Sequence, residues 1–320
     1  MRDGAAVVPT SHRGRILLTG ADRRSYLQGL LTNDIEALRP GTGCYSAMLT
    51  AQGRMLTDMV VLELGDAILL DLPAPVTGAI RDHLDRFVFT EDVKVEDVTA
   101  TRGVAGLYGP RAIDVLAAAP TEGGAPAELF SSTRVRIAGA DAIVVRGDAP
   151  GVAGFDIFAD ASAIPAIESA LIGAGAVPAT AADADAIRIE RGRPLFGADT
   201  DTDTIPLEAG LEDRAISRTK GCYVGQEVIV RVIDRGHGRV ARRLVGLSLP
   251  AGADVPASRA RLTAAGKEIG RVTSAAFSPA LARPIALGYV HRDFVEPGTA
   301  VQVEGSGDAE VAPLPFVPLQ

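Results

Sequence analysis

Short segments with a hydrophobic period of two recur along the chain, and this pattern constrains the fold more than any other feature of the sequence. Near the N-terminus, such segments alternate with stretches in which apolar residues follow helical spacing. A Gln52-Gly53 turn between two of the segments predicts a hairpin. The predicted strands are residues 47–50, 55–64 and 67–72, and the predicted helices are residues 22–31 and 75–88. We therefore expect an α+β fold class, with Asp22 as the N-cap of the first helix.

Two further regions extend the same pattern. Residues 101–180 alternate strands and helices in the order β-α-β-β-(β)-α, which is typical of a ferredoxin-like domain. Beyond Arg243, strand-like segments follow one another between Gly and Pro turns and predict a C-terminal antiparallel β-barrel. Because 320 residues exceed most single cores, we expect three domains. These are a discontinuous α+β domain of residues 1–100 and 181–240, a ferredoxin-like domain of residues 101–180, and a barrel domain of residues 241–320.

Composition excludes several classes of protein. The chain carries 32 basic and 40 acidic residues, and its net charge of -8 disfavours direct nucleic-acid binding. Its 2 cysteines cannot build a disulfide framework, and the sequence shows no ligand spacing for a closed metal site made by this chain alone. No apolar run reaches the roughly 18 residues that a membrane span requires. We therefore expect a cytoplasmic protein that does not bind membranes.

One short motif stands out where an acidic stretch, residues 181–214, meets a basic stretch, residues 218–243. Two solvated loop faces would explain such a charge pattern by themselves. The motif, however, places Cys222 two residues after Lys220 and between glycines 221 and 225. Nearby cations favour the thiolate form of a cysteine, so Cys222 and Lys220 are candidate catalytic residues. The alternative is a buried structural cysteine.

The segment Lys220-Gly221-Cys222-Tyr223-Val224-Gly225-Gln226-Glu227 resembles the signature of the YgfZ family, folate-binding relatives of the glycine-cleavage T-protein (aminomethyltransferase). Supporting similarities are Leu31-Thr32-Asn33-Asp34, Arg188-Ile189-Glu190, Ile205-Pro206-Leu207-Glu208 and Ser278-Pro279. The resemblance implies a three-domain, T-protein-like arrangement. It also implies that the discontinuous domain binds tetrahydrofolate or a folate derivative.

The resemblance assigns roles to individual residues. Glu190 matches the carboxylate that T-proteins place against the pterin ring, although an exposed helix glutamate is the alternative. Asp58 matches the stretch that contains the catalytic aspartate, which implies acid–base work at the reactive end of folate. A strand aspartate that points to solvent is the alternative for Asp58. Tyr223, Gln226 and Arg235 are further expected folate contacts.

The main functional interpretation that follows is a tetrahydrofolate-binding accessory factor for iron–sulfur cluster assembly or repair. Cys222 would then be a shared metal ligand of a [2Fe–2S] cluster held with a partner, and His237 would lie on the same surface or be a solvent-exposed loop residue. The expected partners are folate, iron–sulfur assembly or carrier proteins, and client iron–sulfur enzymes. Two alternatives remain. One is an aminomethyltransferase-type one-carbon transfer enzyme that uses tetrahydrofolate and Asp58, and the other is a thiol redox sensor that uses Cys222 without folate.

Overall fold

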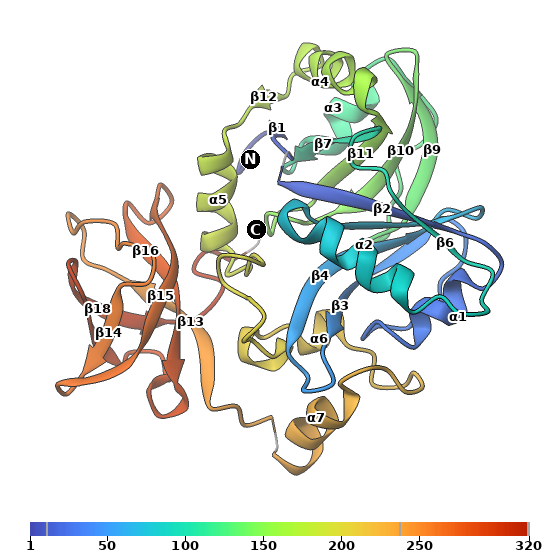
Figure 1. The fold of residues 1–320 in the computed structure, drawn as a ribbon. Coiled ribbons are helices and arrows are strands. Elements are labelled where there is room, and N and C mark those ends of the chain that lie inside the picture. The colour runs from blue at the N-terminus through green and yellow to red at the C-terminus, as the bar shows by residue number, and fades with distance from the viewer. Residues whose placement is uncertain (11, 237, 319–320) are drawn as a thin grey trace. The chain divides into compact units, whose positions relative to one another are not determined.

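The computed structural model describes residues 1–10, 12–236 and 238–318, apart from the side chain of Arg235 (Figure 1). The chain divides into two compact units. Unit 1 comprises Met1–Ala51, Leu56–Ala181 and Arg214–Val224, and unit 2 comprises Gln52–Met55, Ala182–Asp213 and Gly225–Gln320. The three-domain division expected from the sequence stays a prediction.

Unit 1 contains a five-stranded sheet with the strand order β3-β4-β5-β2-β6. Its strands are β2 (Arg13–Thr19), β3 (Thr42–Leu49), β4 (Met55–Glu63), β5 (Ile68–Pro73) and β6 (Lys94–Asp97). The helices that follow β2 and β5 are α1 (Arg23–Gln28) and α2 (Thr77–Arg86), the latter preceded by the 3-10 turn η1 (Ala74–Val76). Both helices pack on one face of this sheet, where Leu27, Ile80 and Leu84 join a buried apolar cluster (Figure 1).

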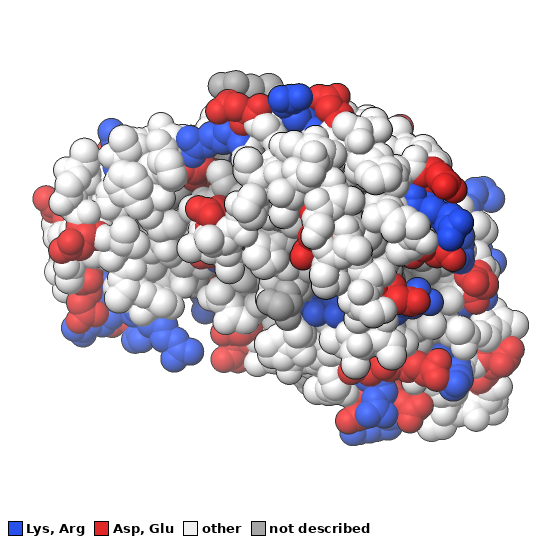
Figure 2. Space-filling model, turned by 90° about the horizontal axis from the view of Figure 1, so that it is seen from above, with Lys and Arg blue, Asp and Glu red and all other residues white. Residues whose placement is uncertain are grey.

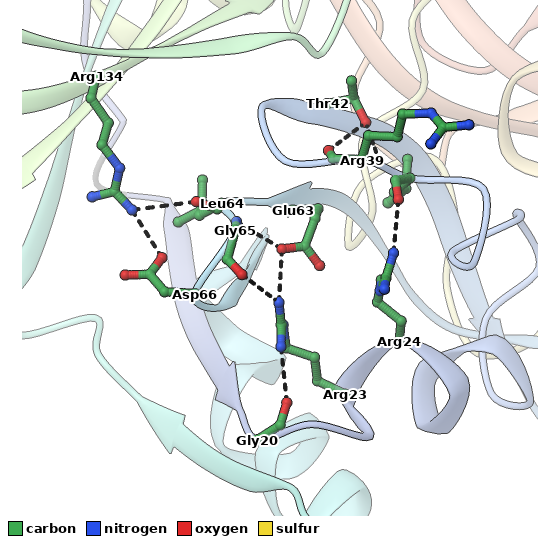
Figure 3. A network of polar contacts seen from close by, with 11 residues as sticks. Gly20, Arg23, Arg24, Arg39, Thr42, Glu63, Leu64, Gly65, Asp66 and Arg134 are labelled. Atoms are coloured by element: carbon green, nitrogen blue, oxygen red, sulfur yellow. Dashed lines mark hydrogen bonds and ion pairs between the residues drawn. The ribbon is translucent and has the colours of Figure 1, made fainter.

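Arginines from two different elements hold the turn between β4 and β5 (Figure 3). Arg23, at the start of α1, donates to Glu63 Oε1 at 3.0 Å and to the carbonyl oxygen of Gly65 at 2.7 Å. Arg134 donates to Asp66 Oδ1 at 2.9 Å from the opposite side of the turn. Glu63 is almost completely buried, and its bond to Arg23 compensates for the loss of water around Oε1, while Oε2 has no donor among the described residues.

A seven-stranded sheet completes unit 1, in the order β12-β1-β7-β11-β10-β9-β8. Its elements are β1 (Ala6–Val8), β7 (Arg102–Tyr108), α3 (Ala112–Ala118), β8 (Thr121–Glu122), β9 (Ser132–Ile137), β10 (Ala140–Gly147), β11 (Gly154–Asp160), η2 (Ala161–Ala163), α4 (Ile164–Gly173) and β12 (Val177–Pro178). Strand β1 pairs antiparallel with β7 and parallel with β12. Apart from β8, which falls in a segment expected to be a loop, the sequence indicated the strands and helices between residues 101 and 172, but it did not place β1 in this sheet.

The two sheets of unit 1 share an apolar layer, which we call the inter-sheet layer. Its buried residues are Leu62, Leu69, Val104, Val145 and Phe158, from strands of both sheets. Because side chains alternate across a strand, these residues face away from the helices that cover each sheet. The inter-sheet layer therefore forms a core separate from the two helix-covered cores.

Unit 2 contains a closed antiparallel barrel with the strand order β13-β16-β15-β14-β17-β18. Its strands are β13 (Arg242–Ser248), β14 (Arg261–Ala264), β15 (Lys267–Ser278), β16 (Arg283–His291), β17 (Ala300–Val303) and β18 (Gly307–Ala312). Its helices include α5 (Ala181–Glu190), η3 (Pro206–Ala209), α7 (Gln226–Val230), the π-helix η4 (Arg231–Arg235) and η5 (Arg292–Phe294), while α6 (Glu212–Ala215) crosses the boundary of the units. The predicted fold class, α+β with a C-terminal antiparallel barrel, is confirmed.

Charged side chains of both signs lie next to each other on the face of the molecule drawn in Figure 2. Exposed ion pairs such as Arg136 with Asp141 and Arg261 with Glu304 have the same character. Exposed pairs of this kind each contribute only about 0–1 kcal/mol. In the described ranges, no helix is long and apolar enough to cross a membrane. The cytoplasmic location expected from the sequence stays a prediction.

Candidate functional site

Polar side chains replace apolar ones at one end of the inter-sheet layer in unit 1. On β5, Asp71 lies two residues after Leu69 and shares its strand face, and on β11 Asp156 lies two residues before Phe158 and shares its face. Other strands and loops add further polar residues at this end. We call the set the polar cluster: Arg13, Tyr45, Asp58, Asp71, Tyr108, Asp148, Asp156 and Arg214. It contains one of the residues that the sequence identified, Asp58.

Asp58 on β4 is buried, with 6% of its surface exposed, so the solvent-facing alternative is wrong. The hydroxyl group of Tyr45 donates a hydrogen bond to Asp58 Oδ2 at 2.8 Å. Burial raises the pKa of Asp58, while the charges of Arg13 and Arg214 and the bond from Tyr45 act in the opposite direction. A carboxyl group with a raised pKa can hold and release a proton closer to neutral pH, as general acid–base catalysis requires.

Arg214 is held in place by both a carboxylate and aromatic rings. It makes a bidentate contact with Asp148, with nitrogen–oxygen distances of 2.8 and 2.5 Å. Its guanidinium carbon lies 4.9 Å from the ring centre of Tyr45 and 5.4 Å from that of Phe130. This cation–π contact holds the ring of Tyr45 in place, and the hydroxyl group of the same residue donates to Asp58. Asp148 therefore acts on Asp58 through Arg214 and Tyr45.

A second chain of contacts joins the two sheets at the same end of the layer. Arg13 on β2 donates from Nε to Asp71 Oδ2 at 3.0 Å, and its charge also acts on Asp58 and Asp156. The hydroxyl group of Tyr108 on β7 donates to Asp156 Oδ1 at 2.6 Å. Burial and the neighbouring charge of Asp71 raise the pKa of Asp156 to about 7. Asp156 is therefore poised to change its charge near neutral pH.

The cysteine motif has a structural anchor at Lys220. Its ammonium group donates to the carbonyl oxygens of Gln28, Leu31 and Asn33, at 2.5, 2.6 and 3.0 Å. These carbonyls lie at and beyond the end of α1, where backbone acceptors lack partners within the helix. Burial lowers the pKa of Lys220 to about 8. Because three acceptors occupy its three N–H groups, Lys220 fastens the motif to α1.

The neighbours of Lys220 differ in exposure. Cys222 is exposed, whereas Tyr223 is buried and its ring centre lies 5.2 Å from the Lys220 ammonium. Cys44 is half-buried beside the core under α1, and burial raises the pKa of its thiol to about 12. The buried alternative for Cys222 is therefore wrong. The catalytic roles of Cys222 and Lys220 and the folate contact of Tyr223 stay predictions.

In unit 2, Glu190 ends α5 and is 1% exposed, so it is not a solvent-facing helix glutamate. Its Oε1 accepts hydrogen bonds from Ser278 Oγ at 2.5 Å and from the backbone N–H of Ala280 at 3.4 Å. Strand β15 and the turn after it therefore position the carboxylate. The assignment of Glu190 to the pterin ring stays a prediction.

Beside Glu190, Arg188 forms a buried ion pair with several hydrogen bonds, which sequence reasoning did not identify. Its guanidinium donates to Asp199 Oδ2 at 2.6 Å, to Asp185 Oδ1 at 2.6 Å and to Ser274 Oγ at 2.7 Å. Asp199 also accepts from the N–H of Leu195 at 3.0 Å and from Thr273 Oγ1 at 2.5 Å. These bonds tie α5, the loop after it and the barrel together.

The remaining predicted residues are placed as follows. Gln226 is the first residue of α7, directly after Gly225, whose φ of 84° requires glycine. The side chain of Arg235 and the whole of His237 lie outside the described residues. Lys220 and Tyr223 lie together, but within the described part of the chain no hydrogen bond or ion pair joins Asp58 to either of them.

Sequence reasoning missed Tyr45, Arg13, Asp71, Tyr108, Asp148, Asp156 and Arg214 as members of the polar cluster. A signal for two of them was present, because Asp71 and Asp156 each interrupt an apolar strand, as Asp58 does. No local pattern indicated that these strands would meet.

Comparison with known proteins covers nearly the whole chain. Residues 1–220 match the family model of the GCVT N-terminal domain, and residues 242–318 match that of the glycine cleavage T-protein C-terminal barrel domain. An aminomethyltransferase from Saccharopolyspora erythraea is 31% identical over 99% of this chain and 88% of its own length. One from Nostoc sp. is 30% identical over 97% of this chain and 83% of its own.

Structural comparison agrees with the family models. The crystal structure of the glycine cleavage system aminomethyltransferase T from Bartonella henselae matches with a TM-score of 0.87 and 27% identity. The match covers 99% of this chain and 87% of the other chain.

These findings correct the main functional interpretation of the sequence. Relatives that match nearly end to end are named aminomethyltransferase, and no comparison supports the narrower YgfZ assignment or an iron–sulfur role. The accessory-factor interpretation is therefore wrong. The [2Fe–2S] cluster shared through Cys222 and the iron–sulfur partners lose their basis with it. The family models match residues 1–220 and 242–318, and they show the broader family that the sequence motifs indicated. The chain belongs to the glycine cleavage T-protein family.

Proposed function

We propose that this protein is an aminomethyltransferase-type enzyme that transfers a one-carbon unit from a carrier-bound amine to tetrahydrofolate. The carbon loses its bonds to the amine nitrogen, which leaves as ammonia, and to the carrier, which is released in its free form. The relatives that share about 30% identity over nearly the full chain support this activity. The observation that carries it in this molecule is the setting of Asp58, a buried carboxylate that Tyr45 holds by a hydrogen bond.

Asp58 is the acid–base residue of the proposed reaction. Burial raises its pKa, so its carboxyl group holds a proton at higher pH than an exposed aspartate does. Tyr45 fixes the orientation of Oδ2, and Arg214 lies against the Tyr45 ring. Asp58 thus presents a proton-exchanging oxygen in a fixed position, which general acid–base catalysis needs at a nitrogen that gains or loses a bond.

The chemistry of the buried acceptors fits tetrahydrofolate. A reduced pterin ring presents several N–H groups, and a buried carboxylate is the acceptor that compensates such donors best. Asp58 in unit 1 and Glu190 in unit 2 are both buried carboxylates. We assign Glu190 to the pterin ring and Asp58 to the reactive end of the cofactor. When bound, tetrahydrofolate supplies the nucleophilic nitrogen that receives the one-carbon unit.

The variant Asp58→Asn tests the proposal. We expect kcat for formation of methylenetetrahydrofolate from an aminomethylated carrier protein to fall about 10²-fold or more, the usual scale for a positioned acid–base group. The matched control is Asp82→Asn, which removes an exposed carboxylate from α2 and should leave kcat unchanged.

Two results would count against this function. Wild-type protein that neither binds tetrahydrofolate in a calorimetric titration nor forms the product is not an aminomethyltransferase. Full activity in Asp58→Asn would retain the reaction but remove Asp58 from its chemistry.

A further inference from the structure

The guanidinium group of Arg214 is held by three side chains of unit 1. Two of its nitrogens donate to the two carboxylate oxygens of Asp148. The rings of Tyr45 and Phe130 lie against its central carbon, at 4.9 and 5.4 Å. A planar guanidinium that is both paired and stacked in this way is restricted to one orientation. The positive charge of Arg214 therefore has a fixed place.

The backbone around Arg214 is fastened to the loop that follows α1. The side-chain amide of Asn33 donates to the carbonyl oxygen of Arg214 at 3.4 Å. The hydroxyl group of Thr32, which is completely buried, donates to the carbonyl oxygen of Ala215 at 2.6 Å. The backbone N–H of Ser217 donates in turn to the carbonyl oxygen of Thr32 at 3.1 Å. These bonds join two distant parts of the sequence into one hydrogen-bonded unit.

Lys220 fastens the other end of the same stretch, residues 214–220, which we call the Arg214 segment. Two of the carbonyl oxygens that accept from its ammonium group belong to Leu31 and Asn33, on either side of Thr32. Both ends of the Arg214 segment are therefore bound to the same short loop. The lysine of the cysteine motif thus belongs to the structure that carries Arg214.

We infer that Arg214 is a positioning residue for Asp58 and that Lys220 holds the segment that carries it. The inference rests on the proposed function for the reaction that Asp58 serves, whereas the contacts of Arg214 stand independently of it. Tyr45 links the two residues, because its ring lies against Arg214 and its hydroxyl group donates to Asp58. Arg214 thereby fixes the hydrogen-bond donor of Asp58, and its charge favours the ionised carboxylate.

Other groups also act on the ionisation of Asp58. Burial raises its pKa most, while the charge of Arg13, the bond from Tyr45 and the charge of Arg214 lower it. On the neighbouring strand β5, Asp71 pairs with Val60, two residues along β4 from Asp58. The other sheet and its loops contribute the remaining titratable members of the polar cluster, which are Tyr108, Asp148 and Asp156. Loss of Arg214 should therefore raise the pKa of Asp58.

The proposed transfer needs the ionised form of Asp58. Asp58 accepts the proton that the attacking nitrogen loses, and a carboxyl group that already holds a proton cannot do so. By favouring the ionised form, Arg214 extends the reaction to lower pH. Without Arg214, the acidic limb of the pH profile of kcat should move to higher pH.

The first test follows the ionisation of Asp58 by NMR, in the full-length protein labelled with carbon-13 at its aspartate carboxyl groups. The variant Asp58→Asn identifies the signal. We expect the titration midpoint of Asp58 to lie at higher pH in Arg214→Gln than in the wild type. Arg214→Lys retains the charge and should bring the midpoint back towards the wild type. The control is Arg136→Gln, which removes an arginine from an exposed pair with Asp141 and should leave the midpoint unchanged.

The second test measures kcat for the transfer across the pH range. On the acidic limb, kcat of Arg214→Gln should be lower than that of the wild type by up to about tenfold, because a nearby positive charge favours the ionised form of a carboxyl group by this order. The difference should become smaller towards the plateau, whereas a merely structural defect lowers kcat equally at every pH. Lys220→Met should move the limb in the same direction, since it releases one end of the Arg214 segment.

The outcomes separate this inference from the proposed function. A shifted NMR midpoint in a protein without transfer activity retains the role of Arg214 and removes the proposed function. An unchanged midpoint in folded Arg214→Gln, with or without transfer activity, overturns the inference. A shift in Arg214→Gln without one in Lys220→Met means that the Arg214 segment keeps its place without Lys220, and the role of the lysine is then wrong.

Discussion

The two units each bury an arginine–aspartate network, and the networks differ in how far their oxygens are satisfied. In unit 2, both carboxylate oxygens of Asp199 accept hydrogen bonds, from Arg188, Leu195 and Thr273. In unit 1, Asp71 Oδ1 has no donor among the described residues, and burial together with the charge of Asp71 raises the pKa of Asp156. A network that is complete stabilises its fold, whereas one that is short of donors is suited to a ligand.

The largest loss of stability should come from breaking the network of Arg188 and Asp199 in unit 2. Arg188→Met leaves Asp199, whose side chain is fully buried, without its cation. Breaking a buried ion pair in this way should lower the free energy of unfolding by about 3–5 kcal/mol. Urea denaturation measures it. The control is Arg261→Met, which removes an arginine from an exposed pair with Glu304 and should cost less than about 1 kcal/mol. Equal losses in the two variants would show that the network of Arg188 does not stabilise unit 2.

A smaller loss of stability is expected when Lys220 is replaced. Lys220 belongs to unit 1, and all three of its N–H groups have acceptors, as expected for a residue that stabilises the fold. Lys220→Met removes the donors of three backbone carbonyls and should cost about 2–3 kcal/mol of unfolding free energy. Cys222→Ser changes an exposed atom and should stay within about 0.5 kcal/mol of the wild type. If the two variants were equally stable, the carbonyls at the end of α1 would not depend on Lys220.

A third effect is a dependence of stability on pH. Because folding raises the pKa of Asp156 from 3.8 to about 7, the folded state binds the proton more tightly than the unfolded state. The resulting stabilisation is present below about pH 4 and is lost as the pH rises towards 7. Asp156→Asn cannot ionise, so its melting temperature relative to the wild type should increase between pH 4 and pH 7.

Melting curves of both proteins across this range measure the difference. A constant difference would mean that Asp156 has an ordinary pKa in the folded protein. The only remaining difference between the two networks would then be the Oδ1 atom of Asp71, which has no hydrogen-bond donor among the described residues.

Local patterns in the sequence predicted most of the secondary structure. The period of two indicated the hairpin of β3 and β4 and five of the six barrel strands, and helical spacing indicated α2, α4 and α5. Asp22 is the N-cap residue of α1, as predicted, but its side chain accepts no hydrogen bond from the helix. Its Oδ2 instead accepts the backbone N–H of Asp92 at 2.8 Å. An N-cap pattern cannot reveal a competing donor that lies far along the chain.

The candidate site was predictable only in part, for the same reason. Asp58 was found through a resemblance to a short segment, whereas its partner Tyr45 lies on another strand and carries no motif. Asp71 and Asp156 belong to different sheets, and only the packing of those sheets brings their charges together. Partnerships of this kind depend on tertiary structure, which no local window of sequence contains.

The position of β1 has a consequence for the order of folding. Ala6 pairs with Tyr108 on one side and with Val177 on the other. Strand β1 can therefore form all its backbone hydrogen bonds only after both β7 and β12 have been synthesised. Contacts between residues so distant in sequence form late and slowly, because closing the intervening loops costs chain entropy. During synthesis, β2 to β5 can assemble their own sheet while β1 remains without partners. The seven-stranded sheet therefore becomes complete only after residue 178 has been added to the chain. In unit 1, the five-stranded sheet is expected to form before the seven-stranded one.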